Sequence, residues 1–139
     1  MRLALENKLY NLKDAIRGGE KPPCDHTLGI SILHAENGIA KGNWNADFMF
    51  LNGNGVIMGG FVSAVADTMM AYAMVSCLDE DRMFSSINLQ TTFHRPVQKG
   101  MVQVEAKIER MGRNIAYATA ILVQDGKEVA VANSSIMLK

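Results

Sequence analysis

Cysteine, proline and aromatic residues are all scarce in this sequence of 139 residues. It holds two cysteines and three prolines, and aromatic residues make up 6% of it. Cys24 and Cys77 stand far apart and share no CxxC or Cys/His spacing, so neither a disulfide framework nor a zinc site is indicated. Charged residues interrupt every apolar stretch near the N-terminus, so we expect no signal peptide and a cytoplasmic protein.

The sequence also has no excess of charge of either sign. Fourteen basic residues balance fourteen acidic ones, which gives a formal net charge of zero. General binding to nucleic acid or to an anionic membrane needs a basic surface, so we expect neither partner. The balance conceals a basic segment, because residues 82–113 hold six basic and two acidic residues. There Arg110 and Arg113 flank a predicted turn, where they would either hold a phosphate group or form a solvated surface.

The N-terminal third predicts a helix followed by a hairpin. Apolar residues recur at helical spacing over residues 3–17, at Leu5, Leu9, Leu12 and Ile16. We expect this helix to end at Gly18-Gly19, and the prolines at 22 and 23 to prevent it from resuming. Alternating apolar residues from Thr27 predict a strand, Asn37-Gly38 predicts a hairpin turn, and residues 39–45 form the returning strand.

A long apolar run covers residues 61–78, and Asp67 is its single charged residue. A helix of about 20 residues spans about 30 Å, so the run is nearly long enough to cross a bilayer. Alanine, methionine and valine dominate it, and a charged side chain at its centre opposes insertion by roughly 2.5–3.5 kcal/mol. We therefore predict a buried central helix rather than a membrane span.

Four more strands are predicted after this helix. They cover residues 86–94, 102–109, 116–123 and 128–138, with a second hairpin signal at Asp125-Gly126. The short connections indicate an antiparallel meander. The economical fold class is α+β, with one antiparallel sheet wrapped around one long central helix. The open edges and second face of such a sheet lead us to expect a dimer.

Asp67 is the strongest candidate for a functional residue. A carboxylate inside an apolar helix lowers helix propensity and carries a desolvation cost. On a helical wheel it shares a small, polar face with Gly60, Ser63, Ala64, Thr68 and Ala71. A ligand or another surface can approach such a face closely. The alternative is a structural carboxylate, bonded to Ser63, Thr68 or a neighbouring chain.

Glycines cluster just before this helix, at positions 53, 55, 59 and 60. The N–H groups of a first helical turn lack intrahelical acceptors, so they can bind an anion or a developing oxyanion, although simple loop flexibility also explains glycine here. The stretch does not match the GxGxxG fingerprint, and the sequence has no GxSxG or GxxxxGK[ST] motif. The three histidines show no metal-ligand spacing, so we expect no metal and no cofactor.

Five short motifs stand in a defined order and spacing: Asn52-x-x-Gly55-x-x-Met58-Gly59-Gly60, Ala64-x-x-Asp67-Thr68, Thr92-Phe93-His94-Arg95-Pro96-Val97-x-x-Gly100, Gly112-Arg113 and Asp125-Gly126-Lys127. Together they resemble the hotdog-fold acyl-CoA thioesterases of the PaaI-like, phenylacetate-pathway type. The resemblance covers about residues 27–138. It implies that residues 1–139 form a single hotdog domain, with residues 1–18 as an N-terminal packing helix, and that the protein hydrolyses an acyl-CoA.

The resemblance also implies roles for individual residues. Gly59 would donate a backbone N–H to the thioester carbonyl, Asn52 would orient substrate or water, and Asp67 would act as general base or nucleophile. Ser86 would assist the water from the neighbouring strand. The residues implied to contact the substrate are Met58, Gly60, Thr68, Arg95, Arg110 and Arg113. Such enzymes combine the glycine and asparagine of one subunit with the acid and serine of another, commonly in a homotetramer that is a dimer of dimers.

One position departs from the family pattern. The family usually has histidine immediately before the two glycines, where this sequence has Met58, so a polar contact near the carbonyl is missing. A non-catalytic acyl-CoA binding protein is therefore one alternative. A hotdog enoyl-CoA hydratase or dehydratase is the other, although it needs a histidine paired with a carboxylate, and no histidine stands near Asp67 in the sequence.

Thioester chemistry suits this small set of residues. The leaving thiol has a pKa near that of cysteine, about 8.5, so its expulsion needs neither a metal nor a strong acid. One carboxylate and a pair of N–H donors are sufficient. Burial should raise the pKa of the Asp67 carboxyl toward the working pH, which favours general-base catalysis.

Overall fold

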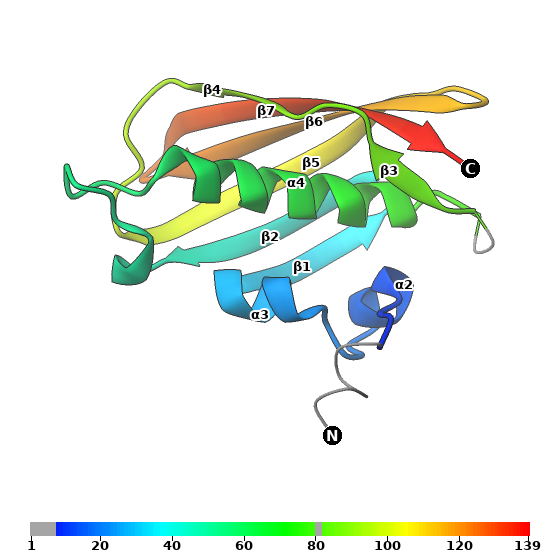
Figure 1. Cartoon of the computed structure of the whole chain (residues 1–139), viewed down its shortest axis with the longest axis horizontal. Coiled ribbons are helices and arrows are strands. Elements are labelled where there is room, and N and C mark those ends of the chain that lie inside the picture. The colour runs from blue at the N-terminus through cyan, green and yellow to red at the C-terminus, as the bar shows by residue number, and fades with distance from the viewer. Residues whose placement is uncertain (1–7, 80–81) are drawn as a thin grey trace.

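A curled antiparallel sheet wraps around one long helix, α4 (Gly59–Val75), in the computed structural model, which describes residues 8–79 and 82–139 (Figure 1). Six strands follow the order β1-β2-β5-β6-β7-β3, and β4 also pairs with β7. Their bounds are β1 (Ile30–Glu36), β2 (Ile39–Ala46), β3 (Phe84–Ser86), β4 (Gln90–Phe93), β5 (Gly100–Met111), β6 (Ile115–Gln124) and β7 (Lys127–Leu138). The predicted fold class is therefore confirmed.

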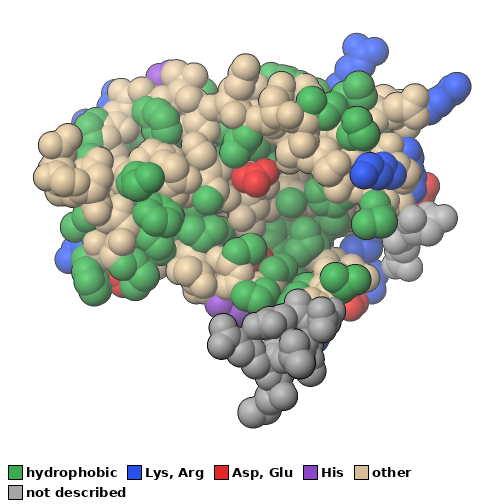
Figure 2. Space-filling model, in the orientation of Figure 1, with side chains coloured by type: hydrophobic (Ala, Val, Ile, Leu, Met, Phe, Trp, Pro, Cys, Tyr) green, Lys and Arg blue, Asp and Glu red, His purple; other side chains and the backbone are tan. Residues whose placement is uncertain are grey.

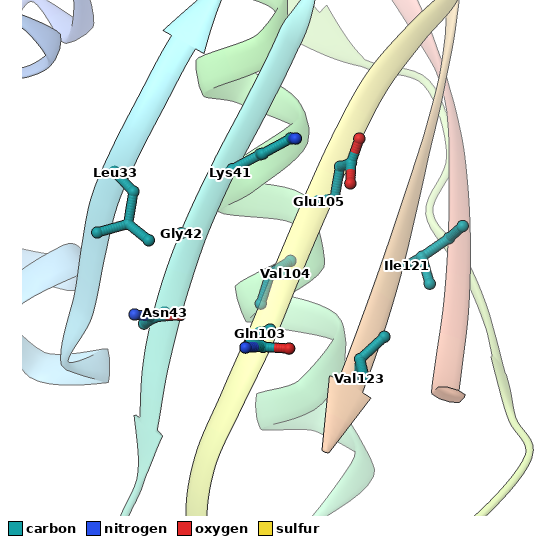
Figure 3. A pocket seen from close by; sticks show the side chains of 9 residues that line it. All are labelled: Leu33, Lys41, Gly42, Asn43, Gln103, Val104, Glu105, Ile121 and Val123. Atoms are coloured by element: carbon teal, nitrogen blue, oxygen red, sulfur yellow. The ribbon is translucent and has the colours of Figure 1, made fainter. Parts of the chain in front are cut away.

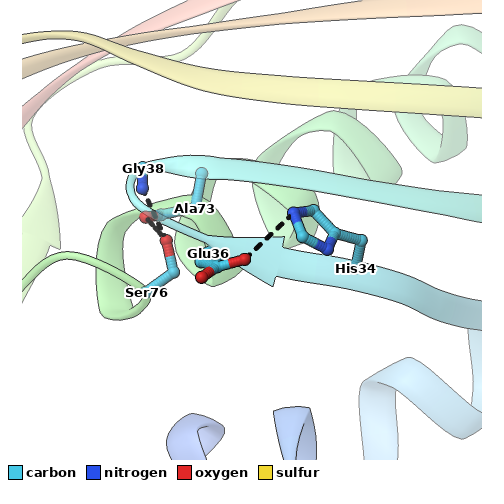
Figure 4. Close-up of polar contacts among 5 residues, drawn as sticks. All are labelled: His34, Glu36, Gly38, Ala73 and Ser76. Carbon is cyan, nitrogen blue, oxygen red and sulfur yellow. Dashed lines mark hydrogen bonds and ion pairs between the residues drawn. The ribbon is translucent and has the colours of Figure 1, made fainter.

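Both predicted hairpin turns are present. Asn37 and Gly38 join β1 to β2 with φ values of 53° and 82°, the positive values that a two-residue turn of this kind requires. Asp125 and Gly126 join β6 to β7 with the same sign of φ. The Gly38 turn is also tied to the end of α4, since its N–H donates to Ser76 Oγ at 2.9 Å (Figure 4). Ser76 in turn donates to the Ala73 carbonyl at 2.7 Å, so the hairpin is fixed against the helix.

The core lies between α4 and the concave face of the sheet. Methionines 69, 70 and 74 of α4 are buried there, against strand residues such as Trp44 and Val102. Gly42 of β2 lets the helix come close, because a Cβ at this position would lie 3.1 Å from Met69 Cε and 2.6 Å from a neighbouring carbonyl oxygen. Within the part of the chain that the structure describes, no helix is both long and apolar enough to cross a membrane.

The N-terminal helix is shorter than the prediction. Residues 1–7 lie outside the described part of the chain, and the helix α2 covers only Leu12–Ile16. Asn11 caps it, because its side chain accepts a hydrogen bond from the Lys13 N–H, and asparagine favours a cap over a helix interior. Leu9 therefore lies before the helix and is 93% exposed, so its predicted place in the apolar stripe is wrong.

The two prolines start a helix instead of preventing one. The helix α3 covers Pro23–Leu28 and has Pro23 in its first turn, where the missing N–H costs nothing and the fixed φ is suitable. It ends at Gly29 in the left-handed conformation. The following strand consequently begins at Ile30 and not at Thr27.

The strand predicted over residues 86–94 is divided into β3 and β4. Asn88 lies in the gap, and its side-chain oxygen accepts a hydrogen bond from the Ser135 N–H at 2.8 Å. Its carbonyl accepts another from Ser134 Oγ at 2.8 Å. A side chain thus replaces part of the regular pairing with β7, which interrupts the strand. The remaining predicted strands correspond to β5, β6 and β7, each extended by a few residues.

Candidate functional site

The small, polar face of α4 lies against the segment from β3 to β4. Residues four positions apart on the helix each contact this segment, in the pairs Gly59–Phe93, Ser63–Thr91 and Asp67–Ser86. Ser63 Oγ donates to Thr91 Oγ1 at 2.7 Å, in the middle of the row. The small residues of this face predicted that another surface could approach it closely. That surface is the segment from β3 to β4 of the same chain.

Asp67 is half-buried, and its hydrogen-bond partner among the described residues is Ser86, whose Oγ donates to Oδ1 at 3.4 Å. Burial raises the pKa of the Asp67 carboxyl above its ordinary value, and the hydrogen bond from Ser86 opposes that rise only in part. Figure 2 shows an acidic group in the middle of the molecular face that it draws, surrounded by uncharged atoms. Asp67 is the acidic residue of α4, and it is a partly desolvated carboxylate with no ion-pair partner among residues 8–79 and 82–139.

The start of α4 offers free backbone donors. The N–H groups of Gly59 and Gly60 have no hydrogen-bond acceptor among residues 8–79 and 82–139. Met58 precedes them as the N-cap residue, and its carbonyl accepts from the N–H of Phe61 at 3.0 Å. The Met58 side chain is half exposed, so an apolar group stands where the resembled family usually has histidine.

A cavity of about 480 Å³ opens beside this helix start. It is lined by Val56, Ile57, Gly59, Val62, Phe93, His94, Arg95, Pro96 and Val97. The volume falls within the range of roughly 300–1,000 Å³ that small-molecule sites occupy. Two predicted site residues, Gly59 and Arg95, are thereby brought together, and the lining is mainly apolar.

Asn52 organises the loop that leads to the helix. Its side-chain oxygen accepts hydrogen bonds from the N–H groups of Asn54, at 2.9 Å, and Val56, at 3.3 Å. Its own N–H donates to the Val56 carbonyl at 2.8 Å. Because the oxygen is used inside the loop, the amide NH₂ group is the part of this side chain left for a ligand.

The other predicted substrate contacts are distributed along the molecule. Thr68 donates its hydroxyl to the Ala64 carbonyl at 2.9 Å, a bond within the helix. Arg95 donates to the Glu128 carbonyl at 2.9 Å beside the cavity. Arg110 and Arg113 lie where β5 ends and turns into β6, at the opposite end of the sheet from the start of α4 (Figure 1). Within one chain these two arginines and Gly59 do not meet.

The sequence did not predict two contacts of α4, one inside the candidate site and one outside it. The Phe93 ring contacts Gly59, and the alternation of apolar residues along its strand does not distinguish Phe93 from its neighbours. Tyr72 of α4 donates a hydrogen bond to the buried Asp25 of α3, next to Cys24. A lone aspartate after two prolines gives no signal for such a partner, because α3 itself was not predicted.

A second hollow lies on the outer face of the sheet, which is the face away from α4 (Figure 3). Lys41 of β2 and Glu105 of β5 are paired in register at its edge, and Gly42 is among its lining residues. Leu33 and Ile121 line its two sides. None of the predicted site residues lines this hollow, so it is not part of the candidate site.

The distance between the two ends of the site has a consequence for its chemistry. Gly59 and Asp67 are eight residues apart on α4, which corresponds to about 12 Å along the axis at ~1.5 Å per residue. A base must reach the reacting water within about 3 Å, or through one further water. The free N–H groups and the carboxylate of one chain thus lie about two helical turns apart.

Comparisons with known proteins agree with this architecture. The thioesterase superfamily profile matches residues 54–131, more than half of the chain. A phenylacetic acid degradation-related protein of Ralstonia eutropha has 32% sequence identity and a TM-score of 0.85, over 92% of this chain and 99% of that one. The Escherichia coli PaaI protein from the phenylacetic acid degradation operon has 25% identity and a TM-score of 0.81, over 90% of each chain.

A relative that matches over a shorter stretch is a candidate esterase of Thermoplasma volcanium, which is 29% identical over 82 residues. That match covers 58% of this chain and 59% of the relative, so the chain spans less than two thirds of this curated protein. The fold is the hotdog fold, as its structural neighbours of the PaaI type show. The matched region contains Gly59, Asp67 and Ser86, and the chain belongs to the thioesterase superfamily.

Proposed function

We propose that this protein hydrolyses an acyl-CoA to a free carboxylic acid and CoA. The observation that carries the proposal is Asp67, a half-buried carboxylate with a raised pKa and a hydroxyl partner, on a helix whose first N–H groups are free. A base of this kind operates closer to neutral pH than an ordinary aspartate does. The superfamily and the phenylacetate-related neighbours support a thioester as the substrate.

In this proposal the site is assembled from two chains. The N–H groups of Gly59 and Gly60 in one subunit polarise the thioester carbonyl, and Asn52 orients the substrate through its amide group. Asp67 and Ser86 come from the other subunit, as in the enzymes that the sequence resembles, and the separation of about 12 Å along α4 is consistent with this division. Exposed apolar side chains in the segments before α4 and between β3 and β4 support a homodimer, among them Phe48, Met49, Met58 and Ile87. A homotetramer would be a dimer of such dimers.

The reaction itself needs few steps. Asp67 accepts a proton from a water molecule as the water oxygen attacks the carbonyl carbon, and the N–H groups stabilise the oxyanion that forms. Collapse of this intermediate breaks the carbon–sulfur bond and releases the CoA thiolate, a good leaving group because the corresponding thiol has a pKa near that of cysteine, about 8.5. The proton held by Asp67 then passes to the thiolate or to solvent, which regenerates the base. The alternative is direct attack by the Asp67 carboxylate, and the raised pKa favours the general-base route over it.

A hydratase is the second candidate, and one contact favours considering it. His94 lines the cavity beside Gly59, and its Nε2 lies 3.9 Å from a Glu128 carboxylate oxygen. This is a histidine and carboxylate pair of the kind that water addition to an enoyl thioester requires. Both side chains are exposed, so the pair lacks the desolvation that distinguishes Asp67.

The decisive experiment is a panel of acyl-CoA esters assayed for thiol release, with the parent protein and Asp67→Ala in parallel. Thiol release by the parent and its loss in the variant would support the proposal. Equal release by both proteins would reject Asp67 as the base. Tight acyl-CoA binding without release would indicate the non-catalytic binding protein, and loss of the enoyl absorbance without free thiol would indicate the hydratase.

A further inference from the structure

The side chain of Phe93 occupies the space next to Gly59. The Cβ of any other amino acid at position 59 would need that space. A Cβ added at Gly59 would lie 2.8 Å from Cζ of the Phe93 ring and 3.2 and 3.3 Å from its two Cε atoms. The far edge of the ring thus points at the helix start, where the free N–H groups lie. The ring contacts the candidate site directly and does not merely lie near it.

The backbone of Phe93 is fixed, whereas its ring is not enclosed. Phe93 pairs with Ala130 of β7, and the next residue, His94, donates its N–H to the Val129 carbonyl at 2.8 Å. The ring itself is 50% exposed. Because its backbone is fixed, Phe93 holds its ring beside Gly59. A large ligand would have to push the ring aside toward solvent.

The cavity beyond the ring is suited to an apolar group. Three of its lining residues, Ile57, Val62 and Val97, are buried, and Pro96 and the Phe93 ring form its sides. The polar side chains of the lining, His94 and Arg95, are exposed. A chain of methylene groups that enters from Gly59 would therefore contact apolar atoms and pass the Phe93 ring.

We infer that Phe93 determines the length of acyl chain that the site accepts. This rests on the proposed function, because it places the thioester carbonyl at Gly59 and the acyl chain in the neighbouring cavity. Phe93 bounds one side of the cavity at Gly59, so with the ring in place the site favours short acyl groups, because a longer chain must push the ring toward solvent. Truncation of the ring enlarges the cavity next to Gly59 and removes that barrier.

The test compares Phe93→Ala with the parent on butyryl-CoA and decanoyl-CoA. We expect the ratio of kcat/KM for decanoyl-CoA to that for butyryl-CoA to rise at least about 10-fold, the lower end of what pocket contacts to an apolar substrate contribute. Phe93→Leu should give a smaller rise and guards against misfolding of the alanine variant. Tyr117→Ala is the matched control, because Tyr117 is 40% exposed on the outer face of the sheet and should leave the ratio unchanged.

Binding of non-hydrolysable thioether analogues of the same two chain lengths separates this inference from the proposed function. If the parent releases no thiol but Phe93→Ala still shifts the ratio of the two Kd values toward the long chain, the inference holds and hydrolysis fails. If the parent hydrolyses both esters and neither ratio responds to truncation of Phe93, the inference is overturned. Absence of both hydrolysis and analogue binding would overturn both.

Discussion

The Tyr72 hydroxyl donates a hydrogen bond to Oδ2 of Asp25 inside the protein, and this contact joins the short helix α3 to the central helix. Asp25 is only 2% exposed. Burial, followed by the bond to Asp25, raises the pKa of the Tyr72 hydroxyl above its ordinary value, so the donor stays protonated. The contact lies on the opposite side of α4 from the residues that touch β3 and β4, which makes it a structural pair rather than part of the candidate site.

Tyr72→Phe should therefore destabilise the fold without changing the proposed chemistry. The substitution leaves a buried carboxylate oxygen without its donor, which costs about 1–3 kcal/mol. Urea unfolding of the variant and the parent would measure the loss in the free energy of unfolding. Tyr117→Phe removes an exposed hydroxyl and should change that free energy by less than about 0.5 kcal/mol. Equal stability of the two variants would show that the buried bond contributes nothing.

The sequence was informative wherever one periodic pattern lay between clear turn residues. Asn37-Gly38, Asp125-Gly126 and the apolar run around Asp67 predicted both hairpins and the central helix correctly. The errors fell where a single side chain overrides the pattern. Asn11 caps a helix that the leucine spacing extended further, and Asn88 takes a pairing partner in the middle of an alternating strand. The Asn11 cap is a local bond to Lys13, whereas the Asn88 bond reaches Ser135, 47 residues away, and the spacing of apolar residues indicates neither.

The candidate site was only partly predictable for a similar reason. Asp67 stands out because a charge in an apolar run is locally anomalous, and Gly59 stands out beside a second glycine. The contacts to Ser86 and Phe93 join positions 19 and 34 residues away, and only the folded chain brings them together. The resemblance supplied Ser86, but no pattern assigned the Phe93 ring to Gly59.

Asp67→Asn should separate catalysis from stability. We expect turnover of an acyl-CoA to fall at least about 100-fold, the lower end for a positioned acid or base. A carboxyl whose folded pKa is raised contributes stability only below its unfolded pKa, and this is lost as pH rises through the folded value. At neutral pH the ionised side chain therefore lowers the free energy of unfolding. The variant should unfold at no lower urea concentration than the parent. Near-parental turnover would reject the assignment.

Ser86→Ala should move the pH profile of kcat/KM. The Ser86 hydroxyl stabilises the ionised form of Asp67 and so lowers a pKa that burial has raised. Without this bond the pKa rises further, and the acid limb of the profile, which reports the free enzyme, shifts to higher pH. Ser85→Ala is the matched control, because Ser85 is the neighbouring serine of β3 and forms no bond to Asp67. Identical acid limbs in the parent and Ser86→Ala would show that the Ser86 hydroxyl does not affect the pKa of Asp67.

Gly59→Ala should impair the protein through the Phe93 ring and not through the backbone donor. Alanine keeps the N–H, but its methyl group would lie 2.8 Å from the ring, so the ring or the helix start must move. We expect kcat/KM to fall at least about 10-fold, since small displacements at a reacting centre are costly. The double variant with Phe93→Leu should recover part of that loss. A purely additive pair of effects would show that the two residues do not act through their contact.

Asn52→Asp tests which half of the Asn52 side chain matters. The oxygen accepts the N–H groups of Asn54 and Val56 and so shapes the loop, whereas the NH₂ group is left for the substrate. Aspartate keeps the acceptor and removes the donor, so the free energy of unfolding should change by less than about 0.5 kcal/mol. The kcat/KM should nevertheless fall about 10- to 100-fold, because a lost hydrogen bond to substrate costs roughly 1–3 kcal/mol.

Asn52→Ala removes both halves, and urea unfolding should show a loss of about 0.5–1.5 kcal/mol per backbone bond. If the aspartate variant keeps the parental kcat/KM, Asn52 only shapes the loop. The substrate would then have to be oriented by the glycine N–H groups.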